Sequence, residues 1–290
     1  MTKNFAIFLL ALFCTASFCC AKMLRYATWN VRWESPKDIE NGDSWEKRKG
    51  PIAKVIRNHD FDIVGLQEGS TYRMKQLLEL LPDYEILQTD SIEYNPIFIK
   101  KNTFQVLEQG RFYLSKTPHK KSKSWDSQHN RHCNWAKLKF DNDTLFVFNV
   151  HFDYKGKDAQ FESSKLMDKK IFAIAGNAPF IFAGDLNFTQ DSDSYKQLGT
   201  LIKMNDSRKV ADEISATNGS YNYFNPQRKS EWTFDHIFAS PRIKVHSYKI
   251  LDETYQDGDK KRYPSDHLPV TIFLELSLTP TPIPKSSCNN

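Results

Sequence analysis

Residues 179–187 read PFIFAGDLN, and this stretch decides the fold. Phe180–Ala183 is a short, continuous apolar run, which is typical of a strand buried on both faces. The run follows a proline and ends at Gly184, which permits a tight backbone before Asp185 and Asn187. The stretch therefore predicts a core strand that delivers a carboxylate and an amide at its carboxyl end, where open α/β sheets bind ligands. A lone motif of this kind is better explained as a turn, so the prediction depends on whether other strands end in the same way.

The composition is that of a globular chain with a sizeable core. Of its 290 residues, 40% are hydrophobic and 13% aromatic, and the net charge is +5. The isoelectric point is near 8.8 and the mean hydropathy is −0.58. This mild positive charge permits an anionic partner without requiring one.

Residues 1–21 are expected to be a signal peptide. Lys3 gives a positive start, the apolar stretch Phe5–Phe13 is too short to span a bilayer, and Cys19-Cys20-Ala21 offers small residues for cleavage after Ala21. A lipid-anchored form is the weaker alternative, because Phe18 or Cys19 would precede the acylated cysteine in place of Gly or Ala. We therefore expect a secreted or periplasmic protein. No later stretch is long enough for a transmembrane helix.

The remainder is expected to form one domain over residues 22–277. Strand-like runs alternate with helical periodicity, and no Pro- or Gly-rich linker or short repeat divides the chain. We expect strands at Met23–Val31, Phe61–Leu66, Tyr84–Gln88, Ile97–Lys100, Phe104–Leu114, Trp135–Phe140, Thr144–Phe152, Phe180–Ala183, Trp232–Phe238, Ile243–Ile250 and Leu268–Leu276. Helices are expected after Ser44 to about Asn58, from the cap Ser70 to Pro82, over Asp158–Ala175, and near Tyr195–Leu201.

The tail and the cysteines add little chemistry. Residues 278–290 are rich in Pro and Ser and are expected to be disordered. Outside the signal segment only Cys133 and Cys288 remain, which allows a single disulfide but neither a disulfide framework nor a zinc site.

Five other strand ends carry polar side chains as the central strand does. Each has a plain explanation as a turn residue, a core histidine with its hydrogen bonds satisfied, or an aspartate paired with a base. Together they form a set of six that is rich in carboxylates and lacks thiolates, which indicates a shared site. The five are Asn30, Glu68, Asn149 with His151, Asp235-His236, and Ser265-Asp266-His267.

In this order the six pieces resemble the endonuclease/exonuclease/phosphatase superfamily, which includes deoxyribonuclease I, abasic-site endonucleases, neutral sphingomyelinases, inositol-polyphosphate 5-phosphatases and deadenylases. The resemblance implies an α/β (α+β) fold: a four-layer α/β/β/α sandwich, with two mixed β-sheets face to face and helices outside. The matching pieces are Thr28-Trp29-Asn30, Gln67-Glu68, Asn149-Val150-His151, Gly184-Asp185-Leu186-Asn187, Asp235-His236-Ile237-Phe238 and Ser265-Asp266-His267-Leu268-Pro269.

The resemblance also assigns a metal site and an attacking water. Glu68 and Asp266 resemble metal ligands, with Asn30 at the metal or beside it. Oxygen ligands without soft partners favour Mg²⁺, with Mn²⁺ or Ca²⁺ as alternatives. Asp185 would orient or deprotonate the water, and Asn187 would hold the water or a phosphate oxygen.

The histidines are assigned to the phosphoryl group. His151 and His267 would bind its oxygens, and Asp235 would orient His267 and keep it protonated, because a nearby anion raises a histidine pKa. The resemblance leaves open whether Asp185 or the His267–Asp235 pair is the base. His236 is interpreted as a bystander.

Candidate substrate-binding residues follow from weaker matches. Glu93 resembles the glutamate that pairs with the equivalent of His151 in deoxyribonuclease I, and Arg131 resembles a phosphate-contacting arginine. An exposed glutamate and a solvated loop cation explain them equally well. Lys260, Lys261 and Arg262 precede Tyr263 and Asp266, and the loop Lys116–Trp125 is also basic and carries a tryptophan. Basic residues interleaved with aromatic ones suit nucleic acid, through phosphate contacts and base stacking.

We therefore expect an exported, monomeric, divalent-metal-dependent phosphodiesterase with nucleic acid as its leading substrate. One alternative is a phosphomonoesterase or a sphingomyelinase-like hydrolase of phospholipids or inositol phosphates. Another is a polyanion-binding module without catalysis, which the complete set of acids and histidines disfavours.

Overall fold

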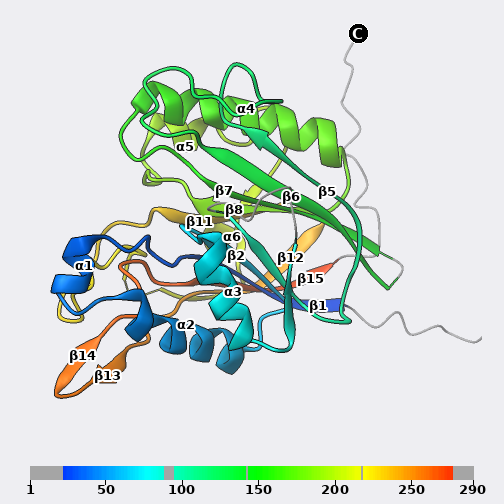
Figure 1. Cartoon of the computed structure of the whole chain (residues 1–290). Coiled ribbons are helices and arrows are strands. Elements are labelled where there is room, and N and C mark those ends of the chain that lie inside the picture. Colours follow the sequence, from blue (N-terminus) through cyan, green and yellow to red (C-terminus); the bar gives the residue numbers. More distant parts are fainter. Residues whose placement is uncertain (1–21, 88–94, 142, 217, 277–290) are drawn as a thin grey trace, which may run out of the picture.

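The computed structural model describes residues 22–87, 95–141, 143–216 and 218–276 (Figure 1). The expected signal peptide, the tail, Cys288 and Glu93 lie outside these residues, so they remain sequence-based predictions. Cys133 is buried with a free thiol. None of the described helices is long and apolar enough to cross a membrane.

Two mixed β-sheets pack face to face, as the resemblance predicted (Figure 1). The first sheet has the order β10 (Glu213–Ser215), β12 (Ile243–Ile250), β15 (Val270–Leu276), β1 (Lys22–Asn30), β2 (Ile63–Gln67), β4 (Ile97–Lys100) and β3 (Tyr84–Ile86). The second has the order β5 (Gln105–Tyr113), β6 (His132–Phe140), β7 (Asp143–His151), β8 (Phe180–Asp185), β11 (Asp235–Ala239) and β9 (Asn205–Asp206). In both sheets a parallel pair at the centre has antiparallel neighbours: β1–β2 in one and β7–β8 in the other.

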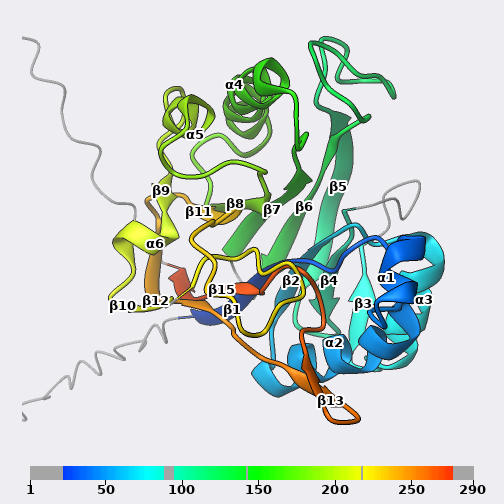
Figure 2. The same ribbon diagram turned by 90° about the vertical axis from the view of Figure 1, so that its left-hand side faces the viewer.

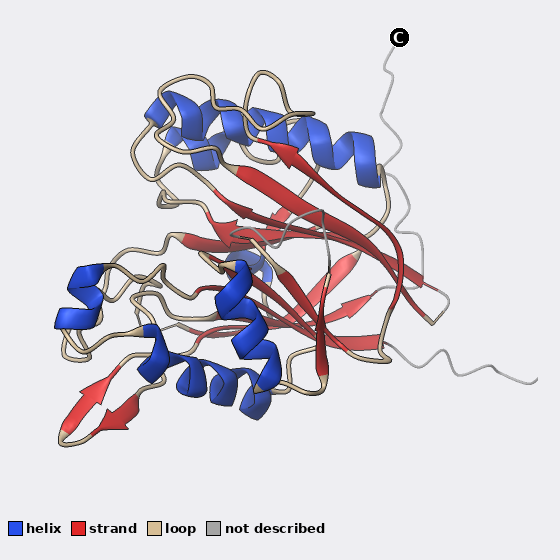
Figure 3. Cartoon of the chain, viewed as in Figure 1, coloured by secondary structure: helices blue, strands red, loops and turns tan. Residues whose placement is uncertain are grey.

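Helices cover the two outer faces, which completes four layers (Figures 2 and 3). Helices α2 (Trp45–His59) and α3 (Thr71–Glu79) lie on the first sheet, and α4 (Lys157–Ala175) and α5 (Asp193–Gln197) on the second. Two short helices, α1 (Pro36–Glu40) and α6 (Ser207–Val210), and the hairpin of β13 (Tyr255–Asp257) and β14 (Lys260–Arg262) lie outside these layers.

Three apolar clusters hold the four layers together, and β8 shows how the sequence divides between them. Ile181 and Ala183 face the cluster between the sheets, whereas Phe180 and Phe182 face the cluster under α4. All four are buried, as the continuous apolar run predicted. Full burial of a large apolar side chain contributes ~1.5–3 kcal/mol, so this strand is a main source of stability.

The structure corrects several predicted boundaries. Strand β11 begins at Asp235 and not at Trp232, because the preceding residues form a loop whose carbonyls accept from Gly219 and Tyr221. Ser44 is the N-cap residue of α2 but makes no capping hydrogen bond through its side chain, whereas Ser70 Oγ accepts from the backbone N–H of α3. The short elements α1, α6, β9, β10, β13 and β14 were not predicted, because two to five residues show no periodicity.

Candidate active site

The polar strand-end side chains gather at one edge of the two sheets. Strands β1, β2, β7 and β8 end there, and the antiparallel strands β11 and β15 begin there. The structure thus brings together residues that are far apart in the sequence: Asn30, Glu68, His151, Asp185, Asp235, Asp266 and His267.

Asp185 is the central acceptor of this group. Its Oδ2 accepts from Asn30 Nδ2 at 3.0 Å and lies 3.3 Å from His151 Nε2 and 3.7 Å from His267 Nε2. Its Oδ1 accepts from the backbone N–H of Asn187 at 2.9 Å. Burial raises the pKa of Asp185 to about 7, although the nearby His267 lowers it. A carboxylate with this pKa can accept a proton at neutral pH.

A close approach of two strands positions Asp185. A Cβ on Gly184 would lie 1.9 Å from the carbonyl oxygen of Val150, so only glycine lets β8 approach β7 this closely. Strand β8 ends at Asp185, and Asn187 has a left-handed φ of 55°. Because the strand does not continue, Asn187 does not repeat the direction of Asp185; its Nδ2 donates to Phe152 O at 3.1 Å.

His151 is a neutral ring held by an arginine. Arg131 Nη1 lies 2.9 Å from His151 Nδ1, and because a guanidinium has no acceptor, Nδ1 must be unprotonated. The proton is therefore on Nε2, which faces Asp185. Burial lowers the pKa of His151 well below its usual value, and the charge of Arg131 lowers it further.

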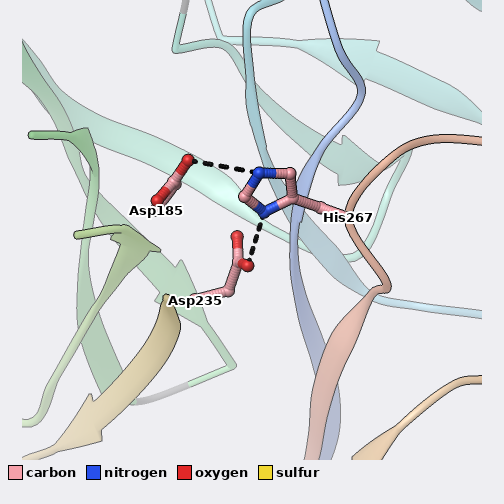
Figure 4. A group of neighbouring side chains, drawn as sticks. All are labelled: Asp185, Asp235 and His267. Carbon is pink, nitrogen blue, oxygen red and sulfur yellow. Dashed lines mark hydrogen bonds and ion pairs between the residues drawn. The ribbon is translucent and has the colours of Figure 1, made fainter. Parts of the chain in front are cut away.

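His267 is the charged counterpart. Its Nδ1 lies 2.7 Å from Asp235 Oδ2, and its Nε2 faces Asp185 (Figure 4). Although burial alone would lower the pKa of His267, the carboxylates of Asp235 and Asp185 raise it to about 10. Asp185 therefore lies between one neutral histidine and one cationic histidine.

Glu68 and Asp266 form a second acidic group beside the first. Glu68 accepts from Asn30 Nδ2 at 3.1 Å and from the backbone N–H of Trp33. Burial raises the pKa of Asp266, as does the charge of Glu68, while His267 and Arg32 lower it. Arg32 Nη1 lies 3.2 Å from Asp266 Oδ2, so a positive charge is already stabilised at this position.

Two groups of side chains are candidates for binding a divalent cation. Asp185, Asp235 and His267 place donor atoms within 4.8 Å of one another. Both ring nitrogens of His267, however, already face the carboxylates of Asp235 and Asp185, so a metal at this group would have to displace a proton from the ring. Glu68 and Asp266 offer carboxylate oxygens alone, which is the donor chemistry that Mg²⁺ prefers, so these two residues fit a hard cation better.

Arg131 lies at the site, whereas the predicted basic cluster does not. Within the described residues, Arg131 Nε is buried without a hydrogen-bond partner. Lys260 and Lys261 are exposed on the β14 hairpin, which projects beyond α1 and α2 (Figure 1), and Arg262 is paired with Asp43 and Asp257. His236 Nε2 donates to Phe188 O at 2.9 Å, and its buried ring packs against Phe188 and Tyr195.

A pocket of about 540 Å³ opens over Glu68 and His151. Its lining includes residues that the sequence did not single out, among them Trp33 and His129. Arg32 was also missed. Its position two residues after Asn30, beyond the end of β1, was the signal that could have found it. The complete lining is Trp33, Glu68, Asn95, Tyr113, Lys121, His129, Asn130, Arg131, His132 and His151.

Comparisons with known proteins found similarity over most of the chain. The model of the Endonuclease/Exonuclease/phosphatase family matches residues 27–267. The chain is similar to a crystal structure of an endonuclease/exonuclease/phosphatase family protein from Bacteroides thetaiotaomicron, with 35% identity and a TM-score of 0.85 over 89% of this chain and 99% of that one. It is also similar to the mannosyl-6-phosphatase of the same species, with 34% identity and a TM-score of 0.83 over 87% and 99% of the two chains. A family protein from Bacteroides vulgatus has 30% identity and a TM-score of 0.79 over 88% and 99%. A search of curated proteins found no match.

Proposed function

The chain belongs to the endonuclease/exonuclease/phosphatase family of phosphoester hydrolases, and from this we propose that it is a divalent-metal-dependent phosphomonoesterase that acts on a sugar phosphate. The observation that carries the proposal is the arrangement around Asp185, with a neutral and a cationic histidine on either side beneath a pocket lined by Arg131. The mannosyl-6-phosphatase of 34% identity supports the choice of substrate.

The residues around Asp185 support hydrolysis by an activated water. Asp185 would take the proton of the attacking water, since its raised pKa makes it a base at neutral pH. Charge that develops on the phosphoryl oxygens would be stabilised by the cationic His267 and by Arg131, which has an unsatisfied donor. His151 would donate a hydrogen bond from Nε2 without adding charge.

Glu68 and Asp266 would hold the cation that enzymes of this family generally require, with Asn30 beside them. When bound, such a cation neutralises charge on a phosphoryl oxygen. Mg²⁺ is the ion we propose, with Mn²⁺ or Ca²⁺ as alternatives, because the donors are carboxylate oxygens.

Nucleic acid, the substrate favoured from the sequence, is now the second candidate. Its main support was the cluster of Lys260 and Lys261 beside Asp266 in the sequence. In the structure these lysines line a separate hollow of about 560 Å³ with Phe224 and Gln227, away from Glu68 and His151. We also retain the proposals that residues 1–21 direct export and that the protein acts as a monomer.

The test is phosphate release from a hexose 6-phosphate by the purified protein with Mg²⁺. We expect turnover that EDTA abolishes and that Asp185→Asn reduces by about 10²–10⁴-fold, the usual contribution of a positioned base. Single-stranded DNA and bis-p-nitrophenyl phosphate are assayed in parallel. Faster cleavage of either diester than of the hexose phosphate would contradict the proposal, and activity in EDTA would remove the metal from it.

A further inference from the structure

Trp33 is a large apolar side chain exposed at the pocket over the reacting groups. Its indole is 43% exposed and lines the same pocket as Glu68, Arg131 and His151. An exposed tryptophan on a pocket wall, only one residue beyond Arg32, requires an explanation, because packing against the protein core does not account for it.

The main chain of Trp33 is fixed to the site. Its backbone N–H donates to the Glu68 carboxylate, whose other oxygen accepts from Asn30. The preceding residue, Arg32, is held in turn by Asp266. The position of the indole is therefore coupled directly to the groups that would bind the phosphoryl end of a substrate.

The indole itself packs against a cation. Arg73 Cζ lies 4.8 Å from the centre of the Trp33 ring, and Arg73 Nη2 is paired with Glu34 Oε1 at 3.3 Å. The second guanidinium nitrogen of Arg73 is buried without a hydrogen-bond partner within the described residues, as expected of a group used for stacking. A ring held in this way loses little conformational entropy when a ligand packs on it.

Apart from the ring of Tyr113, the rest of the pocket lining is polar. Asn130 and His129 lie on it with Lys121, and the ring of His129 also contacts Tyr154. One flat apolar wall with polar groups elsewhere in the lining matches a pyranose, which has an apolar C–H face and hydroxyl groups around its edge. A long flexible acyl chain would leave these polar groups unpaired.

We propose that Trp33 is a substrate-binding residue that packs against the sugar ring of the phosphate ester. The inference rests on the proposed function and specifies which residue recognises the part of the substrate that is not phosphate. Trp33 takes no part in the chemical step. It selects esters whose leaving group carries a ring.

The test compares a ring-bearing ester with one that lacks a ring. For Trp33→Ala we expect kcat/KM on a hexose 6-phosphate to fall about 5–100-fold, mainly through KM, as the loss of an aromatic stacking partner does elsewhere. Glycerol phosphate should change by less than about 2-fold, since it has no ring to stack. Trp33→Phe should retain most of the activity on both esters. Tyr72→Ala, which removes an exposed ring of the same helix as Arg73, is the matched control.

Binding is measured separately from turnover, in an Asp185→Asn background by calorimetry. If the wild type does not hydrolyse hexose phosphate but the Asp185→Asn protein binds it only when Trp33 is present, the proposed function fails and the inference about Trp33 stands. Equal losses on the hexose and glycerol esters in Trp33→Ala would overturn the inference. So would tighter, Trp33-dependent binding of a nucleoside 5′-phosphate than of the hexose phosphate, because the ring recognised would then be a base.

Discussion

Asp185 lies between two histidines that carry different charges, and single hydrogen bonds set that difference. Arg131 occupies the Nδ1 side of His151, so this ring stays neutral, whereas Asp235 occupies Nδ1 of His267 and makes it a cation. The pair gives Asp185 one neutral donor and one ion-pair partner. A difference in protonation state between neighbouring groups allows one site to donate and accept protons at the same pH.

The pKa of Asp185 predicts how the reaction depends on pH. Because only the ionised carboxylate can accept a proton, kcat/KM should rise as the pH approaches the Asp185 pKa of about 7 and level off above it. The rise should approach tenfold per pH unit in the acid range. Initial rates on a hexose 6-phosphate between pH 5 and 9 test this. A profile that is flat between pH 5 and 7 would contradict a base with a pKa near 7.

His267 predicts the pH dependence of stability. Its pKa is about 10 in the folded protein, against an ordinary value of 6.5, so folding favours the protonated ring. This contribution is complete below pH 6.5 and is lost as the pH rises towards 10. The difference in unfolding free energy between the wild type and His267→Gln should therefore shrink from pH 6.5 to 10. Urea unfolding in EDTA measures it, and a difference that grows with pH would refute the charged ring.

Among the secondary-structure elements, α2 holds together the segment that follows β1 and the segment that carries Asp266. Arg48, on its first turns, is fully buried and donates to the carbonyls of Asp43, Val31, Arg32 and Pro264 at 2.7–3.3 Å. These carbonyls lie on the segment after β1 and on the segment before Asp266. One guanidinium thus joins the segment of Arg32 and Trp33, whose backbone N–H binds Glu68, to the segment of Asp266.

Replacing this arginine should loosen both loops. Arg48→Met leaves carbonyl oxygens buried without donors, and we expect a loss of about 2–4 kcal/mol in the free energy of unfolding. Arg57→Met is the matched control. It lies on the same helix, but its side chain is exposed. Replacing an exposed side chain typically changes the free energy of unfolding by ~0.5 kcal/mol. Denaturant unfolding of the wild type, Arg48→Met and Arg57→Met measures the loss of unfolding free energy in each variant. Equal losses for the two variants would mean that burial of Arg48 is unimportant.

Sequence periodicity predicted the long elements and failed at the connections. Ile97–Lys100 and Ile243–Ile250 have the predicted bounds, because apolar side chains fill those strands or alternate along them. The burial of Arg48 could not be predicted, because the residue lies in the charged run WEKRKG, which is typical of a solvent-exposed helix face. It is buried only because loops that are distant in the sequence pack over it. The strand β11 was predicted to begin at Trp232 because aromatic residues favour strands. Contacts with residues distant in the sequence again decided the outcome: the backbone before Asp235 accepts hydrogen bonds from Gly219 and Tyr221 and forms a loop.

At the scale of the whole molecule, the site depends on how the two sheets meet. Glu68 directly follows β2 and Asp266 precedes β15, both strands of the first sheet, whereas His151 and Asp185 end β7 and β8 of the second. Local patterns identified each strand end but not their convergence, which came from the ordered resemblance. Buried amides join the sheets near this edge: Gln67 Nε2 donates to Asn149 Oδ1 at 2.7 Å, and Asn149 Nδ2 donates to Leu66 O at 2.8 Å.

The distance of the β14 hairpin from the pocket predicts that its charge is not needed for small substrates. Charge reversal at both positions, Lys260→Glu with Lys261→Glu, should leave kcat/KM on a hexose 6-phosphate within about 2-fold at 0.15 M salt, where exposed charges are screened beyond about 8 Å. Fluorescence anisotropy measures the affinity for single-stranded DNA, and a lower affinity in the double variant would show that the hairpin binds DNA. A tenfold loss on the hexose phosphate would show that the hairpin belongs to the active site.

Because Glu68 follows β2 and Asp266 precedes β15, a cation bound to both would link two segments that are far apart in the sequence and should stabilise the fold. Binding to the folded state alone raises the unfolding free energy by about 2.7 kcal/mol when the ligand is at 100 times its Kd. We therefore expect Mg²⁺ to raise the melting temperature of the wild type, and EDTA to reverse the effect. Glu68→Gln should abolish the increase, whereas Asp60→Asn, an exposed acid beyond the end of α2, should not. If Glu68→Gln melts later with Mg²⁺ by as much as the wild type does, the cation binds elsewhere, and the Asp185–Asp235–His267 group becomes the site to test by the same melting experiment with Asp235→Asn.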